Sequence, residues 1–455
     1  RRRFGDAAAP LLVSVRSGAP ASMPGMLDTL LNVGMTTEIR DRLAEESGSA
    51  EFASDTAARF AESFGAIVGS ATGIPNDPRA QLREAIEAVF RSWHSDRARV
   101  FREREGIDEQ LGTAVTIQAM VFGNLDDRSG TGVVFTRDPA TGDPEPFGDY
   151  LPRAQGEDVV AGTHNVSGLG VLRDELPEVH AQLLEALRTL EHHYRDICDV
   201  EFTVSAGELY VLQTRIGRRS PLAAVRAAVA MAEEPDFPLS RAEAVARVDQ
   251  DALRAVSEAA TVSPDAVPLA SGLAVSPGVG VGVLSCDPDR AAELASRGID
   301  VILARAETSP ADVHGMVGAS GIVTTLGGVA SHAAVVARSW AIPAVTSAAG
   351  IEVAATGLRA GDDFIAEGEV VTVDGGAGTI YLGDQRQASD TQVAELLTLR
   401  TWARDLGIEP GTAVDETQGQ GRDADVTLLE LARTVQLKGM CTPERAAQAL
   451  ATAED

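Results

Sequence analysis

The sequence predicts a mixed α/β protein made of two modules. Three observations lead to this fold class. Residues Asp199–Arg215 alternate in polarity around Ala206-Gly207, which is typical of a β-hairpin. Residues 36–105 carry helical periodicity, and a glycine-rich β pattern begins near Pro268. A chain of 455 residues with 44% hydrophobic residues is long enough for several cores.

The first module is expected over residues 1–221, with a helical insertion at about 36–105. A short apolar strand, Leu11–Val15, leads into a Gly/Pro/Ser-rich loop, and Asp28 is expected to open a short helix. Two strands are then expected on either side of a polar turn at Asn124–Ser129, before the hairpin.

A helical connector is expected over residues 222–262, followed by the second module over 263–384. This module starts with glycine-rich β structure, continues as strand, helix and strand, and ends in a strand and loop near Gly383. Residues 385–455 are expected to form a polar linker and a small helical C-terminal segment.

The composition excludes several classes of function. A net charge of −28 and a pI near 4.6 argue against bulk electrostatic binding to nucleic acid or to an anionic membrane. The three cysteines, Cys198, Cys286 and Cys441, are far apart and predict neither a zinc site nor a disulfide framework. No signal peptide or membrane-spanning apolar run is recognisable, so a cytoplasmic protein is expected.

The predicted hairpin carries a group of polar side chains on one face. Asp199 and Glu201 are two residues apart, so they point to the same side of a strand, and Gln213 and Arg215 repeat this spacing on the partner strand. Two neighbouring carboxylates repel unless a cation lies between them, and Mg²⁺ held by carboxylates and phosphates satisfies that need. A solvated strand face is the alternative interpretation.

Three further segments are candidates for phosphate or nucleotide contact. Arg16 lies where a strand meets a loop, and its guanidinium would either clamp a phosphate or pair with a surface carboxylate. Thr131 and Gly132 are expected in a tight turn whose N–H groups approach phosphate oxygens, although turns need glycine in any case. Glu157 follows a glycine in another plausible ligand loop.

His332 follows Gly327-Gly328 and precedes a small apolar helical run. Ser331 is a plausible N-cap, so the histidine would occupy the first turn of a helix. Free N–H groups there favour a transferred phosphoryl group and disfavour an imidazolium, which suits a phosphohistidine. A buried structural histidine is the alternative, whereas a metal ligand is not favoured because His314 is far away in sequence.

The motifs, taken in order, resemble those of the pyruvate, phosphate dikinase family, a relative of phosphoenolpyruvate synthase. The resemblance covers residues 4–383 and is carried by segments such as "LLVSVRSGAPASMPGMLDTLLNVG", "SGTGVVFTRDPATG", "AQGEDVVAGTHNV", "EFTVSAGELYVLQTR" and "GGVASHAAVVAR". It implies a partial ATP-grasp domain followed by a swivelling β/β/α phosphohistidine domain. In this family, ATP, phosphate and pyruvate yield AMP, pyrophosphate and phosphoenolpyruvate.

The resemblance also implies residue roles. His332 would carry the phosphoryl group and Arg215 would assist its transfer. Mg²⁺ would be the cofactor, bound with ATP. The implied nucleotide-binding residues are Arg16, Thr131, Gly132, Glu157, Asp199, Glu201 and Gln213, of which Glu201 and Gln213 would also be metal ligands.

Compared with the family, three departures are expected. The first ATP-grasp subdomain, with its phosphate-binding lysine, and the C-terminal barrel that binds pyruvate or phosphoenolpyruvate are not recognisable, and Ala330 replaces the usual threonine. A stand-alone phosphohistidine carrier, or an impaired nucleotide-binding paralogue acting with a separate barrel protein, therefore stays open. A homodimer through the barrel or a barrel-bearing partner would complete the assembly.

Overall fold

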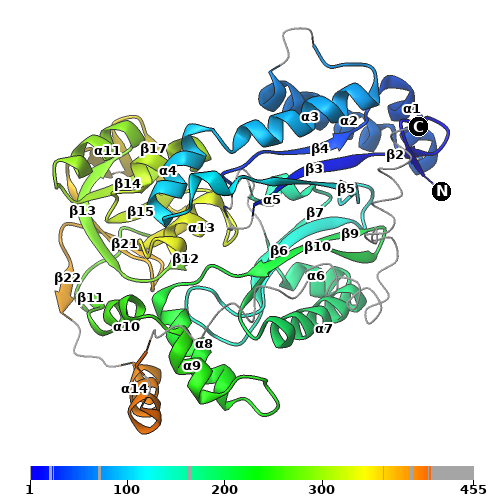
Figure 1. The fold of residues 1–455 in the computed structure, drawn as a ribbon. Helices are drawn as coiled ribbons and strands as arrows, with labels where there is room; N and C mark the ends of the chain where they lie inside the picture. Colours follow the sequence, from blue (N-terminus) through cyan, green and yellow to red (C-terminus); the bar gives the residue numbers. More distant parts are fainter. Residues whose placement is uncertain are drawn as a thin grey trace. The chain divides into compact units, whose positions relative to one another are not determined.

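The computed structural model describes residues 2–19, 23, 25–69, 73–160, 167–361, 363–388, 393–407 and 409–410. They form two compact units, of which the first ends at Ser129 and the second begins at Gly130 (Figure 1). Helices and strands are mixed in both units, which confirms the predicted α/β class. The boundary expected near residue 221 lies within the second unit.

The first unit combines a small antiparallel sheet with helices. The strands follow the order β4-β3-β5, with β3 at Val13–Gly18, β4 at Thr29–Val33 and β5 at Ala114–Ala119. Two short strands, β1 and β2, pair beside it at Arg3–Phe4 and Pro10–Leu11.

Four helices fill the region where a helical insertion was predicted. Each begins at a side chain that accepts a hydrogen bond from a backbone N–H of the first turn, which is the usual reason a helix starts at such a residue. The helices are α1 (Thr37–Ser47), α2 (Ala50–Val68), α3 (Pro78–Ser92) and α4 (Asp96–Glu105), capped by Thr36, Ser49, Asp77 and Ser95.

The prediction of a short helix beginning at Asp28 is wrong. Residues Thr29–Val33 are β4, which pairs with β3 through Val15↔Leu30 and Arg16↔Thr29. Leu30 and Val33 are buried in a core shared with α2 and α3, so pairing and burial decide the conformation of this short apolar run.

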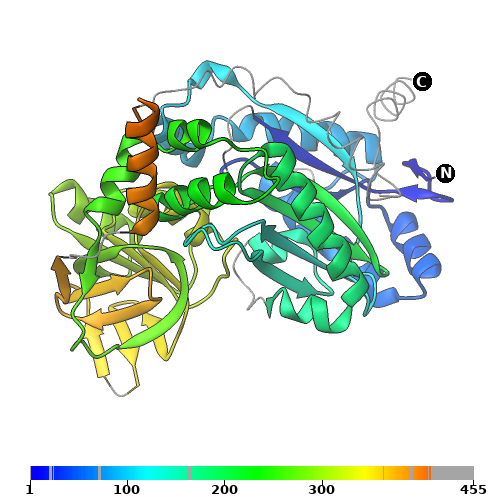
Figure 2. The same ribbon diagram turned by 90° about the horizontal axis from the view of Figure 1, so that it is seen from below.

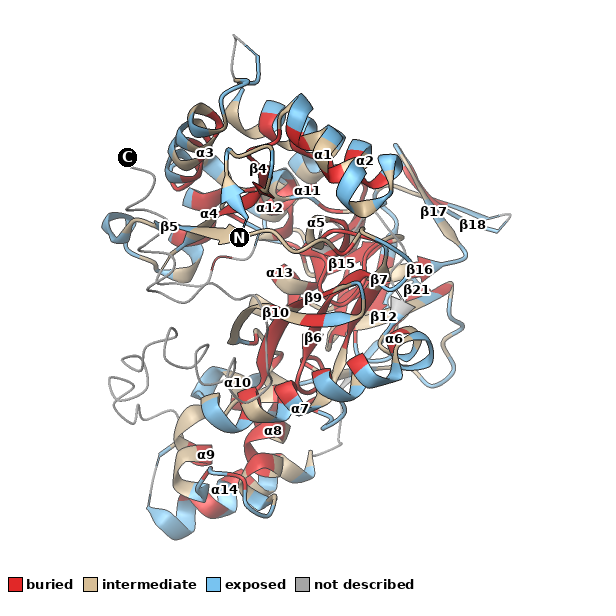
Figure 3. Cartoon of the chain, turned by 90° about the vertical axis from the view of Figure 1, so that its right-hand side faces the viewer, coloured by how far each residue is buried: buried red, intermediate tan, exposed pale blue. Residues whose placement is uncertain are grey.

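The second unit contains a five-stranded antiparallel sheet. Its order is β10-β9-β6-β7-β8, and β9 and β10 form the predicted hairpin, with Ala206 and Gly207 both at positive φ in the turn. Figure 3 shows β6 and β9 as largely buried, and α7 (Pro177–Tyr194) packs on β9 and β10. The strands are β6 (Gly130–Phe135), β7 (Phe147–Pro152), β8 (Ser167–Gly168), β9 (Cys198–Ser205) and β10 (Glu208–Ile216).

The two strands expected around the polar turn Asn124–Ser129 are present as β5 and β6. They belong to different sheets, one in each unit, so the turn marks a change of unit and not a hairpin. Two short helices, α5 (Gly156–Val160) and α6 (Gly170–Glu175), follow β7 in the second unit.

A helical layer follows the sheet. The predicted connector contains α8 (Pro221–Glu233), α9 (Arg241–Arg247) and α10 (Gln250–Ser257). Helix α14 (Ala394–Leu406), orange in Figure 2, packs against α8 and α9 although a polar linker was expected there. Its buried Leu396, Leu399 and Trp402 join the core of the other three helices. The expected C-terminal helical segment lies outside the described residues.

A closed seven-stranded barrel forms the second predicted module. Its order is β12-β16-β15-β14-β13-β20-β21, closed by pairing of β21 with β12. The strands are β12 (Ala270–Ser276), β13 (Val279–Ser285), β14 (Val301–Arg305), β15 (Gly321–Thr324), β16 (Ala344–Ala349), β20 (Val370–Asp374) and β21 (Thr379–Leu382).

Three helices and two small sheets accompany the barrel. The helices are α11 (Pro288–Ser296), α12 (Val313–Met316) and α13 (His332–Ser339). The small sheets consist of β17 (Ile351–Ala354), β18 (Gly357–Ala360) and β19 (Asp363–Ala366), and of β11 (Ala260–Val262) paired with β22 (Arg386–Ala388). Among the described helices, none has both the length and the apolar character needed to cross a membrane.

Candidate functional site

One face of the five-stranded sheet gathers the polar residues of the predicted platform. Across the strands, Arg215 lies opposite Asp199, and Gln213 lies opposite Glu201. Directly opposite residues of an antiparallel pair point to the same face, and so do residues two apart on one strand. All four side chains therefore share one face, as the sequence predicted.

The same face continues onto β6 and β7. Val133 lies opposite Glu201 on one side and opposite Asp149 on the other, while Phe135 lies opposite Asp199. Asp149 therefore belongs to a row that runs Gln213, Glu201, Val133, Asp149 and continues to Gly168 on β8. The local sequence around Asp149 does not predict that it lies on the same face as Glu201, because this follows only from the pairing of the strands.

Arg215 neutralises both carboxylates of the platform. Its Nε lies 2.7 Å from Asp199 Oδ2, and its Nη2 lies 3.5 Å from Glu201 Oε1. Burial raises the pKa of Asp199, although the charge of Arg215 opposes that shift. Burial alone would lower the pKa of Arg215, but the two facing carboxylates raise it. The guanidinium is thus held charged between two acids.

The donor set of this face suits Mg²⁺. Asp199 Oδ1 is buried and has no hydrogen-bond partner, so an oxygen lone pair is left for a cation. Glu201 and Gln213 add further oxygen donors on the same face, and Mg²⁺ prefers oxygen ligands shared between carboxylates and substrate phosphates. Within the described residues, no group of three or more His, Cys, Asp or Glu is clustered as a metal site.

The other predicted nucleotide residues are more scattered. Thr131 and Gly132 lie within β6 and not in a tight turn, and β6 is paired on both sides, so the sheet already engages its backbone. A Cβ at Gly132 would meet Asp149 O and the Phe202 ring at 2.5 Å, so packing explains this glycine. The Thr131 hydroxyl donates to Phe202 O at 3.0 Å.

Glu157 lies on α5 and is half-buried. Arg16 lies on β3 of the first unit, not in a loop, and is also half-buried. The nucleotide-binding roles of Thr131, Gly132, Glu157 and Arg16 stay predictions.

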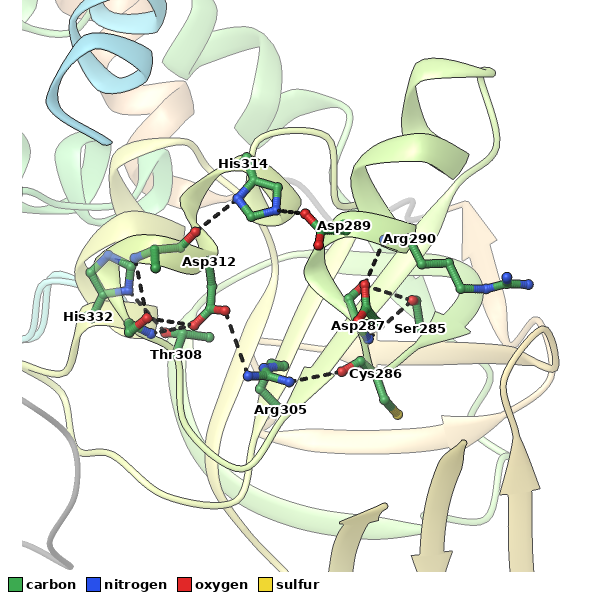
Figure 4. A network of polar contacts seen from close by, with 12 residues as sticks. Ser285, Cys286, Asp287, Asp289, Arg290, Arg305, Thr308, Asp312, His314 and His332 are labelled. Atoms are coloured by element: carbon green, nitrogen blue, oxygen red, sulfur yellow. Dashed lines mark hydrogen bonds and ion pairs between the residues drawn. The ribbon is translucent and has the colours of Figure 1, made fainter. Parts of the chain in front are cut away.

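His332 begins α13 as predicted. Ser331 is the N-cap, and its hydroxyl accepts from the Ala334 N–H at 3.4 Å. The imidazole is buried, at 8% exposure, and its Nδ1 lies 3.1 Å from the Thr308 hydroxyl (Figure 4). One ring nitrogen therefore lies within hydrogen-bond distance of a neighbouring hydroxyl, which orients the ring.

Thr308 belongs to a braced loop. Directly after it, the Ser309 N–H and hydroxyl both donate to Asp312 Oδ2, at 2.7 and 3.0 Å, and form a capping box. Arg305 lies 3.7 Å from Asp312 and donates to the Cys286 carbonyl at 3.1 Å, which joins the loop to the barrel (Figure 4). Sequence reasoning missed Thr308, because its contact is with a histidine 24 residues away in the chain.

The loop before His332 rests on the sheet face. The Ala330 N–H donates to Asp149 Oδ2 at 3.1 Å, and Ala330 joins an apolar cluster with Val133 and Val159. The fully buried Arg338 donates to the Val329 carbonyl at 2.7 Å. Since Val133 lies directly opposite Glu201, the histidine loop and the carboxylate platform share one face of the sheet.

Comparisons with known proteins agree with these two parts. Residues 1–181 match the family model for the AMP/ATP-binding domain of pyruvate phosphate dikinase. Residues 299–378, which contain His332, match the model for the mobile domain of PEP-utilising enzymes. The chain therefore carries an AMP/ATP-binding domain and a mobile domain of the kinds found in pyruvate, phosphate dikinases.

Individual pyruvate, phosphate dikinases match most of this chain but only about half of their own length. Pyruvate, phosphate dikinase of Rickettsia conorii is 39% identical over 455 residues, covering 89% of this chain and 52% of the relative. The Rhizobium meliloti protein is 40% identical, covering 84% and 49%. Pyruvate, phosphate dikinase 2 of Zea mays is 38% identical, covering 89% and 51%. The chain thus spans about half the length of the dikinases it matches.

Proposed function

We propose that His332 accepts a phosphoryl group from a nucleotide held on the sheet face and carries it to a second site. The observation that supports this most directly is the position of the histidine loop against the five-stranded sheet. Ala330 packs on Val133, the strand neighbour of Glu201, so the loop lies on the same face as Asp199, Glu201 and Arg215.

The residues support a division of labour. Because Thr308 engages Nδ1, Nε2 is the nitrogen that would attack phosphorus, while a phosphoanhydride P–O bond of the nucleotide breaks. The α13 N-terminus favours the negative charge that the ring then carries. Arg215 would stabilise charge on the transferring group, because phosphoryl transfer depends mainly on positioning and electrostatics.

Asp199, Glu201 and Gln213 would hold the metal–nucleotide complex, with Glu201 and Gln213 as metal ligands. When bound, Mg²⁺ would neutralise phosphate charge and orient the phosphates. Arg16, Thr131, Gly132 and Glu157 are proposed as further nucleotide contacts on the strength of the family resemblance.

The complete reaction would follow that of the relatives. ATP and phosphate would load His332, and the phosphoryl group would pass to pyruvate to give phosphoenolpyruvate. The acceptor step requires a pyruvate site, supplied by a barrel domain of the whole protein or by a barrel-bearing partner. We expect this reaction in the cytoplasm, without nucleic acid or membrane.

The test is labelling of the histidine. The chain is incubated with β-³²P-labelled ATP, phosphate and Mg²⁺, or with labelled phosphoenolpyruvate and a separately supplied barrel domain. We expect acid-labile, alkali-stable label that is lost in His332→Ala. His314→Ala is the matched control, because His314 is an exposed histidine of the same barrel that bonds Asp289. Label that survives in His332→Ala would refute the assignment.

Nucleotide binding is measured beside the labelling. Calorimetric binding of Mg·ATP without any phosphohistidine would favour an impaired nucleotide-binding paralogue. Labelling from phosphoenolpyruvate alone would favour a stand-alone carrier.

A further inference from the structure

The contact between the histidine loop and β7 has an unusual donor arrangement. Asp149 is buried at 4% exposure, and its carboxylate accepts a hydrogen bond from the Ala330 N–H at 3.1 Å. A peptide group of the loop that precedes His332 therefore donates to a side chain of β7, although Ala330 and Asp149 are 181 residues apart in the chain. A hydrogen bond from an N–H group to a carboxylate is stronger than one to a neutral acceptor.

The same short loop is held from the other side by Arg338. Its Nη2 donates to the Val329 carbonyl at 2.7 Å, and its Nη1 donates to the Val275 carbonyl of β12 at 3.3 Å. The guanidinium also lies 5.1 Å from the centroid of the Phe135 ring on β6. Arg338 thus ties the loop to the barrel and approaches the sheet, whereas Asp149 holds the loop from the sheet alone.

The contact has little apolar support. Its apolar part consists of Ala330, Val133 and Val159, with Leu151 packed beside them. A single methyl group of Ala330 buries far less apolar surface than a Leu or Phe would. The hydrogen bond from the Ala330 N–H to the Asp149 carboxylate is therefore expected to dominate the attachment of the loop, since hydrogen bonds to charged groups are stronger than those between neutral groups.

We propose that Asp149 is a positioning residue that latches the histidine loop onto the nucleotide-side sheet. It acts through the backbone N–H of Ala330, so it orients His332 without touching the reacting atoms. The latch favours transfer from a nucleotide on the sheet and shields the imidazole from donors in solution. This inference rests on the proposed function for its nucleotide step only.

The latch predicts opposite effects on two phosphoryl donors. In Asp149→Leu, which removes both acceptor oxygens at similar volume, ATP-dependent labelling of His332 should fall about tenfold or more. Labelling by phosphoramidate should rise several-fold, because this small donor reaches a released loop. There, the imidazole nitrogen attacks phosphorus, the P–N bond of phosphoramidate breaks, and ammonia leaves with the displaced proton. A merely structural role would lower both labels together.

Amide hydrogen exchange measures the latch without any nucleotide. Exchange of the peptide 325–331 should accelerate about tenfold or more in Asp149→Leu, while the β14 peptide 301–305 keeps the wild-type rate. Asp149→Asn, which keeps one acceptor, should lie between the two. Asp143→Asn is the matched control, because Asp143 is an exposed carboxylate that precedes β7, and it should match wild type.

The outcomes separate the two hypotheses. If wild type takes no label from ATP but the exchange and phosphoramidate results hold, the proposed function fails and the latch stands. If loop exchange in Asp149→Leu is unchanged, or if the barrel peptide loosens equally, the latch is refuted. Equal loss of both labels also refutes it. Ala330→Asp provides an independent break, and the double variant with Asp149→Leu should add no further acceleration.

Discussion

The carboxylate platform and the histidine loop are two parts of one candidate site that arise in different ways. The platform is built by a two-residue turn and a strand register, so four residues within 17 positions of the chain reach one face together. The histidine loop is held by Thr308, 24 residues away, and by Asp149, 181 residues away. Local pairing makes the platform, whereas long-range hydrogen bonds make the loop.

This difference teaches where rigidity and movement are placed. The platform side chains lie on a sheet braced by α7, whose inner residues are buried against the strands. The histidine loop is attached to that sheet by few contacts, and it carries the group that would have to move between two sites. A phosphoryl carrier needs an attachment that positions it precisely but can be released, and a few charged hydrogen bonds provide such an attachment.

The largest expected effect breaks the platform. Arg215→Lys keeps the charge but loses the planar guanidinium that contacts Asp199 and Glu201 together. We expect the rate of ATP-dependent His332 labelling to fall about 100-fold, measured by single-turnover quench, because loss of one preorganised charge contact at a transferring group has effects of this size. Phosphoramidate labelling should stay at the wild-type level, since that donor does not need the platform.

Arg188→Lys is the matched control for this prediction. Arg188 is an exposed residue of α7, on the helix that packs against the other side of the hairpin, and its substitution should leave both labels unchanged. A rate in Arg215→Lys within threefold of wild type would show that the platform does not act in transfer.

The same division explains what the sequence could predict. The hairpin, its turn and the shared face of Asp199, Glu201, Gln213 and Arg215 follow from a period of two over 17 residues. The Ser331 cap and the start of α13 follow from local capping chemistry. These features depend on neighbours in the chain, so pattern and spacing were sufficient.

Other features depend on partners distant in the chain. Leu30 and Val33 became strand because β3 offers hydrogen bonds and a core lies beneath them, which a five-residue pattern does not reveal. Helix α14 was missed because its surroundings in the sequence are polar. Its large buried apolar residues, Leu396, Leu399 and Trp402, all face the core that α8, α9 and α10 form. Asp149, Thr308 and Arg338 were missed because their roles are contacts across the fold.

A smaller effect concerns the stability cost of the loop attachment. Burial raises the pKa of Asp149 to about 6, although the N–H groups of Ala330 and Val329 and the charge of Arg338 lower it. The folded protein therefore binds this proton more tightly than the unfolded chain does. The contribution of this group to stability is present at low pH and is lost as pH rises from about 4 through about 6.

The prediction compares Asp149→Asn with wild type by urea unfolding at pH 5 and pH 7.5. Because Asn carries no charge to bury, the variant should gain about 1.4 kcal/mol of stability relative to wild type between pH 5 and pH 7.5. The Asp143→Asn variant should show no such trend. A stability difference that is the same at both pH values would mean that Asp149 does not bury its charge.

The smallest effect tests how the ring itself is held. Thr308→Val removes the hydroxyl at 3.1 Å from His332 Nδ1 and keeps the shape of the side chain. One neutral hydrogen bond is worth about 1 kcal/mol, so phosphorylation should slow about fivefold for both ATP and phosphoramidate. Both donors use the same ring nitrogen, so both rates should fall together. In Arg215→Lys and Asp149→Leu, by contrast, the two donors should respond differently.

Thr308→Ser restores the hydroxyl and should recover most of the rate, whereas a purely steric role would leave Thr308→Ser impaired and Thr308→Val active. The site of modification gives a second readout, since a ring without its Nδ1 partner offers both nitrogens. Phosphorus NMR of the labelled Thr308→Val protein should then show a second phosphohistidine isomer beside the Nε2 form. A single isomer at the wild-type rate would mean that the α13 start alone orients the ring, and the histidine loop would then be as locally determined as the platform.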